Sequence, residues 1–369
     1  MKLISLRFLF MAVIATLSPL SWAKLDFEDH AFPELVTSAR ALALGNAYLN
    51  KSDDAWSAFY NPSGLGSVRK LQFHLANAHF EASNGLTRVI GDGPAYQIPG
   101  KYADTFDPTE MRTALAKDQG TLAHSRMNFF PNLTLRGMTL GYMYSQRNRA
   151  IINDDVANTF ELAERRDHGP VFALNAALFG GVFKIGASAV YLMRQQLYKE
   201  VGPSEAVNIG NQDYQKGKSL QITTGARLTL PVAMLPTFSA VLRNATQNDF
   251  EAEEKGGLPD AIKQTIDLGL SITPQIGKGS RVHMEVNMKD INNSYKTNAK
   301  RRLAAGTEID FNRRIFLRAG YGDGWGSGGL GVRTRSFILD LTTYAVDRSL
   351  DDFRKVEDRR WVISISSGF

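Results

Sequence analysis

The stretch Ile266-Asp267-Leu268-Gly269-Leu270-Ser271-Ile272-Thr273 alternates apolar residues with polar or small ones. Side chains point to opposite faces along a β-strand, so this period of two predicts a strand with one apolar face. The same alternation recurs along the second half of the chain, most clearly over residues 282–289, 302–311 and 314–321. A chain built from such segments is expected to be all-β.

Roughly fourteen segments of this kind extend from residue 71 to the end of the chain. We predict strands near residues 71–80, 127–136, 138–148, 158–179, 182–199, 217–230, 235–246, 265–273, 281–291, 301–311, 314–321, 328–335, 337–346 and 360–369.

The connections between these segments alternate in length. The short ones lie at 137, 180–181, 231–234, 274–280, 312–313 and 336, and the long ones near 81–126, 149–157, 200–216, 247–264, 292–300, 322–327 and 347–359. Outer-membrane barrels have short periplasmic turns, longer extracellular loops and usually an even number of strands. A soluble β-sandwich is not expected to alternate short and long connections in this way. We therefore predict a transmembrane antiparallel β-barrel over residues 69–369, with both of its ends on the periplasmic side.

The first 23 residues predict an export signal. Lys2 and Arg7 precede the apolar run Leu9–Leu20, and Ser21 and Ala23 place small residues where signal peptidase cleaves. The alternative, an N-terminal anchor helix, would need about 20 apolar residues. We expect residues 1–23 to be a cleaved signal peptide and the mature protein to reside in the outer membrane.

Composition argues against several other functions. The chain has 43 Lys and Arg against 37 Asp and Glu, and no basic patch interleaved with aromatic residues, so we expect no nucleic-acid partner. It has no Cys, no metal-ligand spacing among its 6 His and no GxSxG elbow, so we expect no cofactor, no metal site and no catalytic residue. The loop acids Glu251, Glu253 and Glu254 could hold a divalent ion, although such clusters are more often solvated.

The last segment resembles an assembly signal. Trp361, Ile363, Ile365 and Phe369 share one apolar face of the predicted terminal strand, and the chain stops on the aromatic residue. A C-terminal strand of this kind resembles the signal that the barrel-assembly machinery binds, although Ser367 departs from the bulky residue often found there.

Residues 24–68 do not alternate as a strand would. They contain the runs Arg40–Ala47, Asp53-Asp54-Ala55 and Asn61-Pro62-Ser63-Gly64-Leu65, which are rich in small residues and glycine turn points. Pro62 biases Asn61 away from helix. A compact segment of this kind can occupy a confined space, so we predict a hatch that plugs the barrel.

This segment resembles the N-terminal hatch of the FadL family of outer-membrane channels for long-chain fatty acids and other hydrophobic compounds. It is also similar to the PorV-like and TraF-like barrels. The resemblance implies a monomeric fourteen-strand barrel that takes up a hydrophobic small molecule between its outer loops and releases it through a gap in the wall. It places the following residues in the hatch: Arg40, Gly45, Asp53, Asp54, Asn61, Pro62 and Gly64. Gly45 would lie at a tight turn, and Asp53 and Asp54 would pair with lumen arginines. The alternative is that these residues only fold the plug.

In a membrane barrel the polar face of each strand points into the lumen. We therefore expect a set of mixed charges inside: His283, Glu285, Lys289, Arg302, Glu308, Asp310, Arg314 and Arg318, with Arg333 and Asp340. They either line an aqueous pore or form an interior closed by ion pairs.

Two prolines interrupt predicted strands. Pro131 and the pair Gly169-Pro170 lie where a closed barrel has no free edge to tolerate a missing N–H. One hypothesis is that Gly169 and Pro170 mark a lateral opening in the wall, and the alternative is that a strand begins at Pro170. In the first long loop, Asp107-Pro108-Thr109-Glu110 predicts the start of a short helix that roofs the barrel.

The leading hypothesis is a channel that passively transports a hydrophobic small molecule and is surrounded by outer-membrane lipid and lipopolysaccharide. The alternative is a barrel that does not transport and instead docks a partner protein. An apolar path from the loops to the wall would favour transport. A lumen filled by charge pairs behind a sealed wall would favour docking.

Overall fold

The computed structural model describes residues 25, 27, 29, 31–154, 157–253, 257–277, 279–349 and 353–368. The predicted signal peptide 1–23, Phe369 of the assembly signal and the loop acid Glu254 lie outside these residues.

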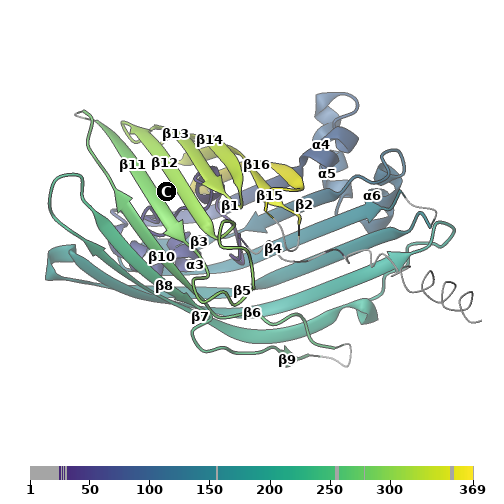
Figure 1. Cartoon of the computed structure of the whole chain (residues 1–369), viewed down its shortest axis with the longest axis horizontal. Coiled ribbons are helices and arrows are strands. Elements are labelled where there is room, and N and C mark those ends of the chain that lie inside the picture. The colour runs from purple at the N-terminus through teal and green to yellow at the C-terminus, as the bar shows by residue number, and fades with distance from the viewer. Residues whose placement is uncertain are drawn as a thin grey trace, which may run out of the picture.

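The strands form one closed antiparallel barrel (Figure 1). Their bounds are β1 (Gln72–Ser83), β2 (Ala123–Phe129), β3 (Asn132–Leu135), β4 (Met138–Ile152), β5 (Phe160–Leu178), β6 (Phe183–Val201), β7 (Gln215–Thr229), β8 (Thr237–Arg243), β10 (Thr265–Ile272), β11 (Ser280–Met288), β12 (Leu303–Phe311), β13 (Ile315–Gly322), β14 (Trp325–Arg333), β15 (Phe337–Asp347) and β16 (Glu357–Gly368). β2 and β3 are two pieces of one spanning strand, and β9 (Glu251–Ala252) is a short loop strand that pairs with β7. The wall therefore has 14 strands, and β16 pairs with β1 to close it. The predicted all-β barrel is confirmed.

One predicted long connection is wrong. Residues 322–327 do not form a loop, because Gly322 pairs with Trp325 and the strand resumes at once. Asp323 and Gly324 have φ values of 50° and 84°, the signs that a two-residue type I′ hairpin requires. The sequence Asp323-Gly324 is typical of this tight turn and could have predicted it.

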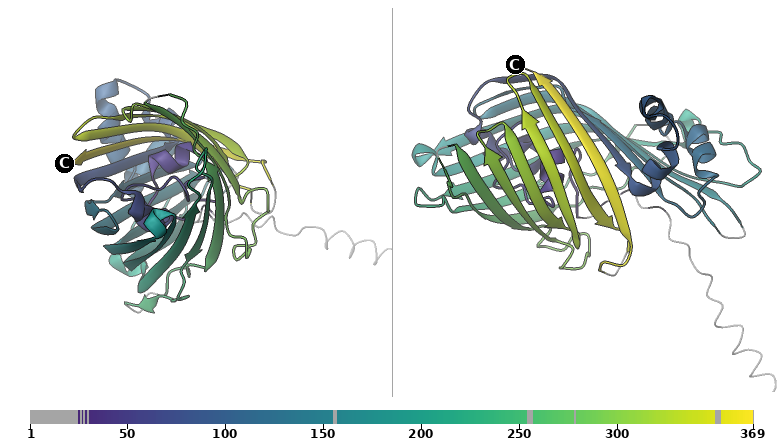
Figure 2. Two further views of the ribbon diagram at one scale, coloured as in Figure 1. Left: turned by 90° about the vertical axis from the view of Figure 1, so that its left-hand side faces the viewer. Right: turned by 90° about the horizontal axis from the view of Figure 1, so that it is seen from above.

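Four neighbouring strands are much longer than the bilayer needs. β5 and β6 have 19 residues each and β4 and β7 have 15 each, against about 9–11 for a membrane crossing. These strands continue beyond the rim on the loop side, as Figure 1 and the right-hand view of Figure 2 show. No described helix is long and apolar enough to span a membrane.

The first loop holds α4 (Asn84–Ile90), η2 (Ala95–Gln97), α5 (Ile98–Asp104) and α6 (Pro108–Leu115). Asp107 caps α6 by accepting from the N–H groups of Thr109 and Glu110, as the sequence predicts. The helix does not roof the lumen, however. Met111 and Leu115 pack with Ala150 of β4, which alternates with the lumen-facing Arg149. The loop helices therefore cover the outer face of the long strand ends.

The segment before β1 lies inside the barrel (Figure 2, left). It contains α2 (Ala39–Ala43), α3 (Ser57–Tyr60) and η1 (Pro62–Ser67), and nearly all of its described residues are buried. α2 contacts β13–β16, whereas η1 contacts β5, β6 and β7. The short helices η3 (Phe179–Gly181) and η4 (Asn211–Asp213) lie in connections between strands. The internal segment, called the hatch below, thus spans the lumen from one wall to the other.

Gly45 ends the first hatch helix in a conformation that only glycine adopts without strain. Its φ is +63°, and a Cβ atom here would collide with the backbone of Tyr321 in β13. We predict that Gly45→Ala lowers the free energy of unfolding by at least about 1–2 kcal/mol, the cost of a left-handed conformation with a Cβ. Urea unfolding in lipid vesicles measures it. The matched control is Gly100→Ala in α5, where no atom lies within 4 Å of the added Cβ. Equal effects of both substitutions would contradict the packing argument.

Candidate channel lumen and hatch

A chain of ion pairs joins α2 to the wall at β12–β15. Arg40 donates to Glu308 through Nε (2.8 Å) and to Asp53 through Nη1 (2.7 Å). Glu308 also accepts from Arg318 at 2.8 Å, and Arg318 continues to Asp340 at 2.5 Å. Glu308 is fully buried and is approached by Lys51 at 3.2 Å as well. It is therefore the acid on which three cations converge.

The sequence placed Asp53 and Asp54 against lumen arginines, but the structure places them beside Arg40 of the hatch itself. Burial alone would raise the pKa of the Asp53 carboxyl, yet the Arg40 guanidinium holds that pKa at about 2. The two acids therefore help to keep Arg40 in place, and Arg40 in turn reaches the wall.

A second set of charges holds the hatch against β8, β10 and β11. Glu34 accepts from Lys289 at 2.7 Å and from Arg243 at 3.2 Å, and Arg243 also donates to Asp267 at 2.8 Å. Glu285 accepts from the backbone N–H groups of Asn50 and Lys51.

At the loop side, the most N-terminal described part of the hatch is held by arginines. Asp29 is bonded by Arg149 of β4 and by Arg360 of β16, the latter at 2.8 Å. Beside it, Glu81 accepts from His124 at 2.7 Å and from the Tyr344 hydroxyl at 2.7 Å. All of these side chains are buried.

The Asn-Pro turn is fixed by its own side chain and by glycines of the wall. Asn61 Oδ1 accepts from the Ser63 N–H at 3.1 Å, and its Nδ2 donates to the Leu49 carbonyl at 2.9 Å. A Cβ at Gly186 of β6 would collide with Pro62, and one at Gly225 of β7 would collide with Asn61. A Cβ at Gly64 would likewise meet Ser52. The turn therefore sits directly against the backbone of β6 and β7.

The predicted lumen charges divide into two groups. His283, Glu285, Lys289, Glu308, Arg318 and Asp340 are buried inside. Arg302 lies at the loop end and donates to the Asp290 carbonyl, while Asp310 accepts from the Arg313 N–H at the turn end. Arg314 is exposed in the β12–β13 turn, so its placement in the lumen is wrong. Arg314 lies one residue before β13, and outside the strand the alternation of side chains no longer determines whether a residue faces the lumen or the lipid.

Part of the wall on the other side of the hatch is apolar, although Asn175 of β5 and Lys184 of β6 also bond the hatch there. Met143 of β4, Val171 and Ala173 of β5, and Val190 and Leu192 of β6 form one buried cluster with hatch residues Trp56 and Phe59. The Phe59 ring lies 5.0 Å from that of Phe130, at the junction of β2 and β3. We call this cluster the apolar track. The sequence prediction missed it because it assumed a polar lumen, although Val171-Phe172-Ala173-Leu174 is apolar on both faces.

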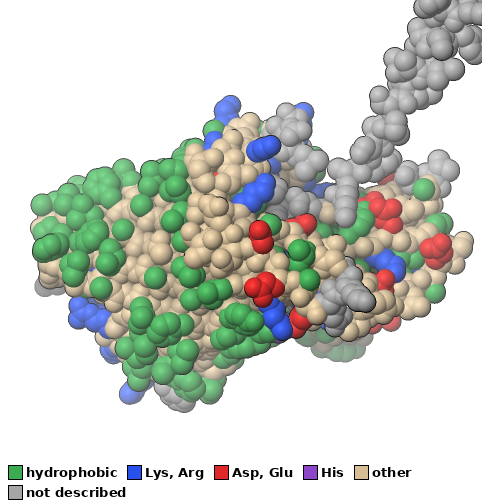
Figure 3. Space-filling view, turned by 90° about the horizontal axis from the view of Figure 1, so that it is seen from below, with side chains coloured by type: hydrophobic (Ala, Val, Ile, Leu, Met, Phe, Trp, Pro, Cys, Tyr) green, Lys and Arg blue, Asp and Glu red, His purple; other side chains and the backbone are tan. Residues whose placement is uncertain are grey.

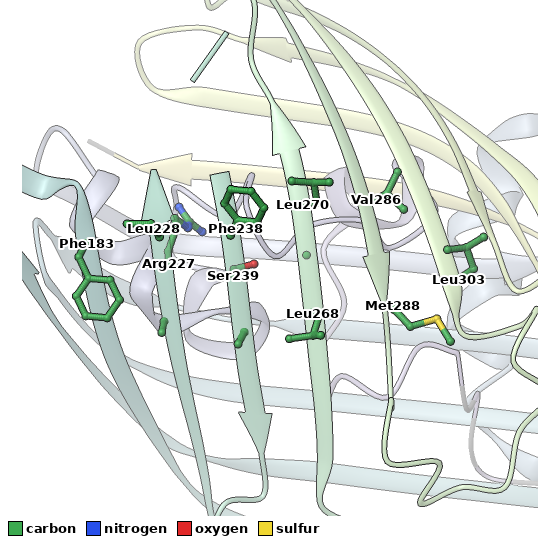
Figure 4. A pocket seen from close by; sticks show the side chains of 13 residues that line it. Phe183, Arg227, Leu228, Phe238, Ser239, Leu268, Leu270, Val286, Met288 and Leu303 are labelled. Atoms are coloured by element: carbon green, nitrogen blue, oxygen red, sulfur yellow. The ribbon is translucent and has the colours of Figure 1, made fainter. Parts of the chain in front are cut away.

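The apolar track reaches a small cleft on the loop side. The cleft has a volume of about 50 Å³, and its apolar lining consists of Pro33, Leu35, Ala58, Phe59, Val190 and Ile262. The rest of the lining is largely polar and includes the ion-paired Glu34 and Arg243. Asn244 and Thr265 also line the cleft, and each has a buried side-chain oxygen without a hydrogen-bond partner. Two wider hollows, of about 570 and 810 Å³, lie instead on the lipid-facing wall. Figure 4 shows the first, with Leu228, Phe238 and Leu268 among its residues.

Beside the cleft, the apolar track also borders interruptions in the wall. The β5–β6 ladder skips Gly169 and Pro170, where a Cβ on Gly169 would collide with Tyr191. Across β4, the break between β2 and β3 falls at Phe130-Pro131. β4 pairs with Gly169 and Pro170 without a break, and β5 pairs with β6 on both sides of the skipped residues, so the gap in the β5–β6 ladder is a short one. β5 spans Phe160–Leu178, so the alternative that a strand begins at Pro170 is wrong.

No family model matches this chain, and no curated protein matches it. Among solved structures, the toluene transporter TbuX of Ralstonia pickettii aligns over 90% of this chain and 98% of its own, with 10% identity and a TM-score of 0.50. A deltaS2 mutant of the monoaromatic hydrocarbon channel TodX aligns over 93% and 100%, again with 10% identity and a TM-score of 0.50. The protein has the FadL-type fold. The resemblance stated from the sequence is thereby confirmed for the barrel and its plug, while the hatch residues keep their roles as expectations.

In this FadL-type barrel, no group of three or more His, Cys, Asp or Glu side chains among the described residues could hold a metal ion. The arrangement suits a plug that is pinned by charge on one side and rests on apolar surface on the other.

Glu308 offers a direct test of the ion-pair chain. We predict that Glu308→Gln destabilises the barrel by about 3–5 kcal/mol, the usual cost of removing one partner of a buried ion pair. It also exposes the hatch to trypsin at Lys51, because Arg40 and Lys51 lose their shared acid. Urea unfolding and timed proteolysis of the reconstituted protein measure the two effects. Asp310→Asn, two residues along the same strand, is the control. The ion-pair chain would be unimportant if both variants behaved alike.

Proposed function

We propose that the protein is an outer-membrane channel that passively transports a hydrophobic, fatty-acid-like small molecule. The observation that carries this proposal is the apolar track, which borders both the cleft on the loop side and the interrupted ladder at Gly169 and Pro170. A lumen that served only to close the barrel would gain nothing from an apolar wall on one side.

The closed track is filled by the hatch. Trp56 and Phe59 occupy it, so transport requires these two rings to withdraw. Apolar contacts are non-directional and scale with the area that is buried. A hydrophobic ligand that replaces the rings would restore many of the apolar contacts that are lost when the rings withdraw. A polar solute would not restore them. The track therefore selects for apolar ligands.

The opposite half of the lumen explains how the plug stays in place during such a movement. Arg40 and Glu34 hold the hatch to β8–β15 through buried ion pairs, whose loss costs far more than a shift of apolar side chains. We propose that the hatch hinges on this charged half and opens on the apolar half.

Release into the membrane is proposed at the interrupted ladder. Pro170 offers no N–H to β6, and Gly169 has φ +158°. Fewer hydrogen bonds must break for the wall to part here than at any fully laddered position.

The track is tested by placing a polar group in it. We predict that Val171→Gln lowers uptake of labelled oleate by at least about tenfold, because an unpaired buried amide costs about 1–3 kcal/mol. Cells with and without the gene give the baseline, and outer-membrane fractions give the amount of protein. The control is the same change at the exposed loop residue Val356. Labelled toluene is measured in parallel, and unchanged uptake of both probes by Val171→Gln would exclude the track as the route.

The exit is tested separately at Pro170. We predict that Pro170→Val, which restores an N–H for the β5–β6 ladder, slows uptake several-fold while the barrel still assembles. Pro231→Val in the exposed β7–β8 turn is the matched control. A Pro170→Val variant that transports at the normal rate would remove the lateral exit from the proposal.

The alternative function, docking of a partner protein, is favoured by the long ends of β4–β7 and by the ion pairs that fill half of the lumen. If uptake of both probes is the same with and without the gene, while the protein sits in the outer membrane, the docking role replaces transport. Crosslinking from Tyr96, which is 80% exposed on the first loop, would then identify the partner.

A further inference from the structure

The short connections carry charge of one sign only. The segments 69–71, 136–137, 179–182, 230–236, 273–279, 312–314 and 334–336 contain no Asp or Glu. Their described basic side chains are all exposed, and we call them the basic arc: Arg69, Lys70, Arg136, Arg313, Arg314 and Arg335. Among the described residues, none of the six forms an ion pair with an acidic side chain.

The basic arc is continuous around part of the periplasmic rim. The β12–β13 turn, the β14–β15 turn, the chain entering β1 and the β3–β4 turn follow one another around the wall. The next two turns, β5–β6 and β7–β8, have no charged residue and expose Phe179, Val232 and Met234. On the face in Figure 3, acidic side chains lie toward the loop end and none lies at the short-turn end.

Three parts of the basic arc border exposed, lipid-facing apolar residues. Arg313 and Arg314 stand between Phe311 and Ile315, which are 39% and 47% exposed. Lys70 is followed by the exposed Leu71, and Arg335 stands two residues before the exposed Phe337. The cations therefore lie at the boundary of the hydrophobic band, at the depth where lipid headgroups begin.

We propose that the basic arc binds anionic phospholipid headgroups of the periplasmic leaflet. Like charges that stand together repel one another, and an anionic headgroup relieves that repulsion. The nearby Asp310 accepts from the backbone N–H of Arg313 and forms no ion pair with the guanidinium groups of the arc. The acyl chains of the same lipid would lie on the neighbouring apolar residues, so both parts of one molecule have a surface to contact. An acidic protein would neutralise the charge but would not cover residues that face the hydrocarbon. This inference is independent of the transport function.

The test uses the delipidated barrel in detergent, titrated with phosphatidylglycerol or with phosphatidylcholine of the same chains. Native mass spectrometry counts the lipids that are retained. We expect the wild-type protein to prefer phosphatidylglycerol, and the triple variant Arg313→Gln/Arg314→Gln/Arg335→Gln to lose at least about tenfold of that preference. The preference should also fall with added salt, because exposed charges are screened.

The control removes three exposed lysines from the outer loops, Lys117→Gln/Lys296→Gln/Lys300→Gln, with the same change in net charge. It should keep the wild-type preference. Equal retention of both lipids by the wild-type protein, or equal loss in the control and in the arc variant, would overturn the proposal. Heat stability of each variant, measured beforehand, shows that the barrels compared are folded.

Discussion

Everything in this structure depends on the closure of the backbone hydrogen-bond ladder by the pairing of β16 with β1. Hydrocarbon offers no partner for an N–H or a carbonyl, so a membrane strand must pair on both sides. Closure fixes which face of each strand meets lipid and which meets the lumen. It also encloses an interior that water would enter, and the hatch is the part of the chain that fills it.

The hatch can fill that interior only where backbone approaches backbone. Gly45 lies against β13, and the Asn61-Pro62 turn lies against Gly186 and Gly225 of β6 and β7. A side chain at any of these glycines would hold the two surfaces apart. The glycines of the wall and those of the hatch thus serve the same close packing of backbone on backbone, although they lie in distant parts of the sequence. Neither part of the sequence alone predicts this packing.

This explains what the sequence could and could not predict. Strand identity, number and order follow from a period of two and from connection length, which are local. The lumen charges at Glu285, Glu308 and Arg318 follow from the same period. The partner of Asp53 does not, because Arg40 and Asp53 are brought together by the fold of the hatch, which has no period to read. The apolar residues Val171 and Val190 were missed for a different reason: periodicity marks which faces are apolar, but a strand that is apolar on both faces carries no period.

The two halves of the lumen hold the plug by different interactions, ion pairs on one side and apolar contacts on the other. Buried ion pairs such as Arg40–Glu308 demand a fixed geometry and lose most of their energy when one partner moves away. The contacts of Trp56 and Phe59 with the wall accept any apolar surface of similar shape. A plug held in both ways cannot loosen evenly. Under the proposed transport function, the plug would therefore move first on the apolar side, beside the point where Pro170 leaves the ladder between β5 and β6 incomplete.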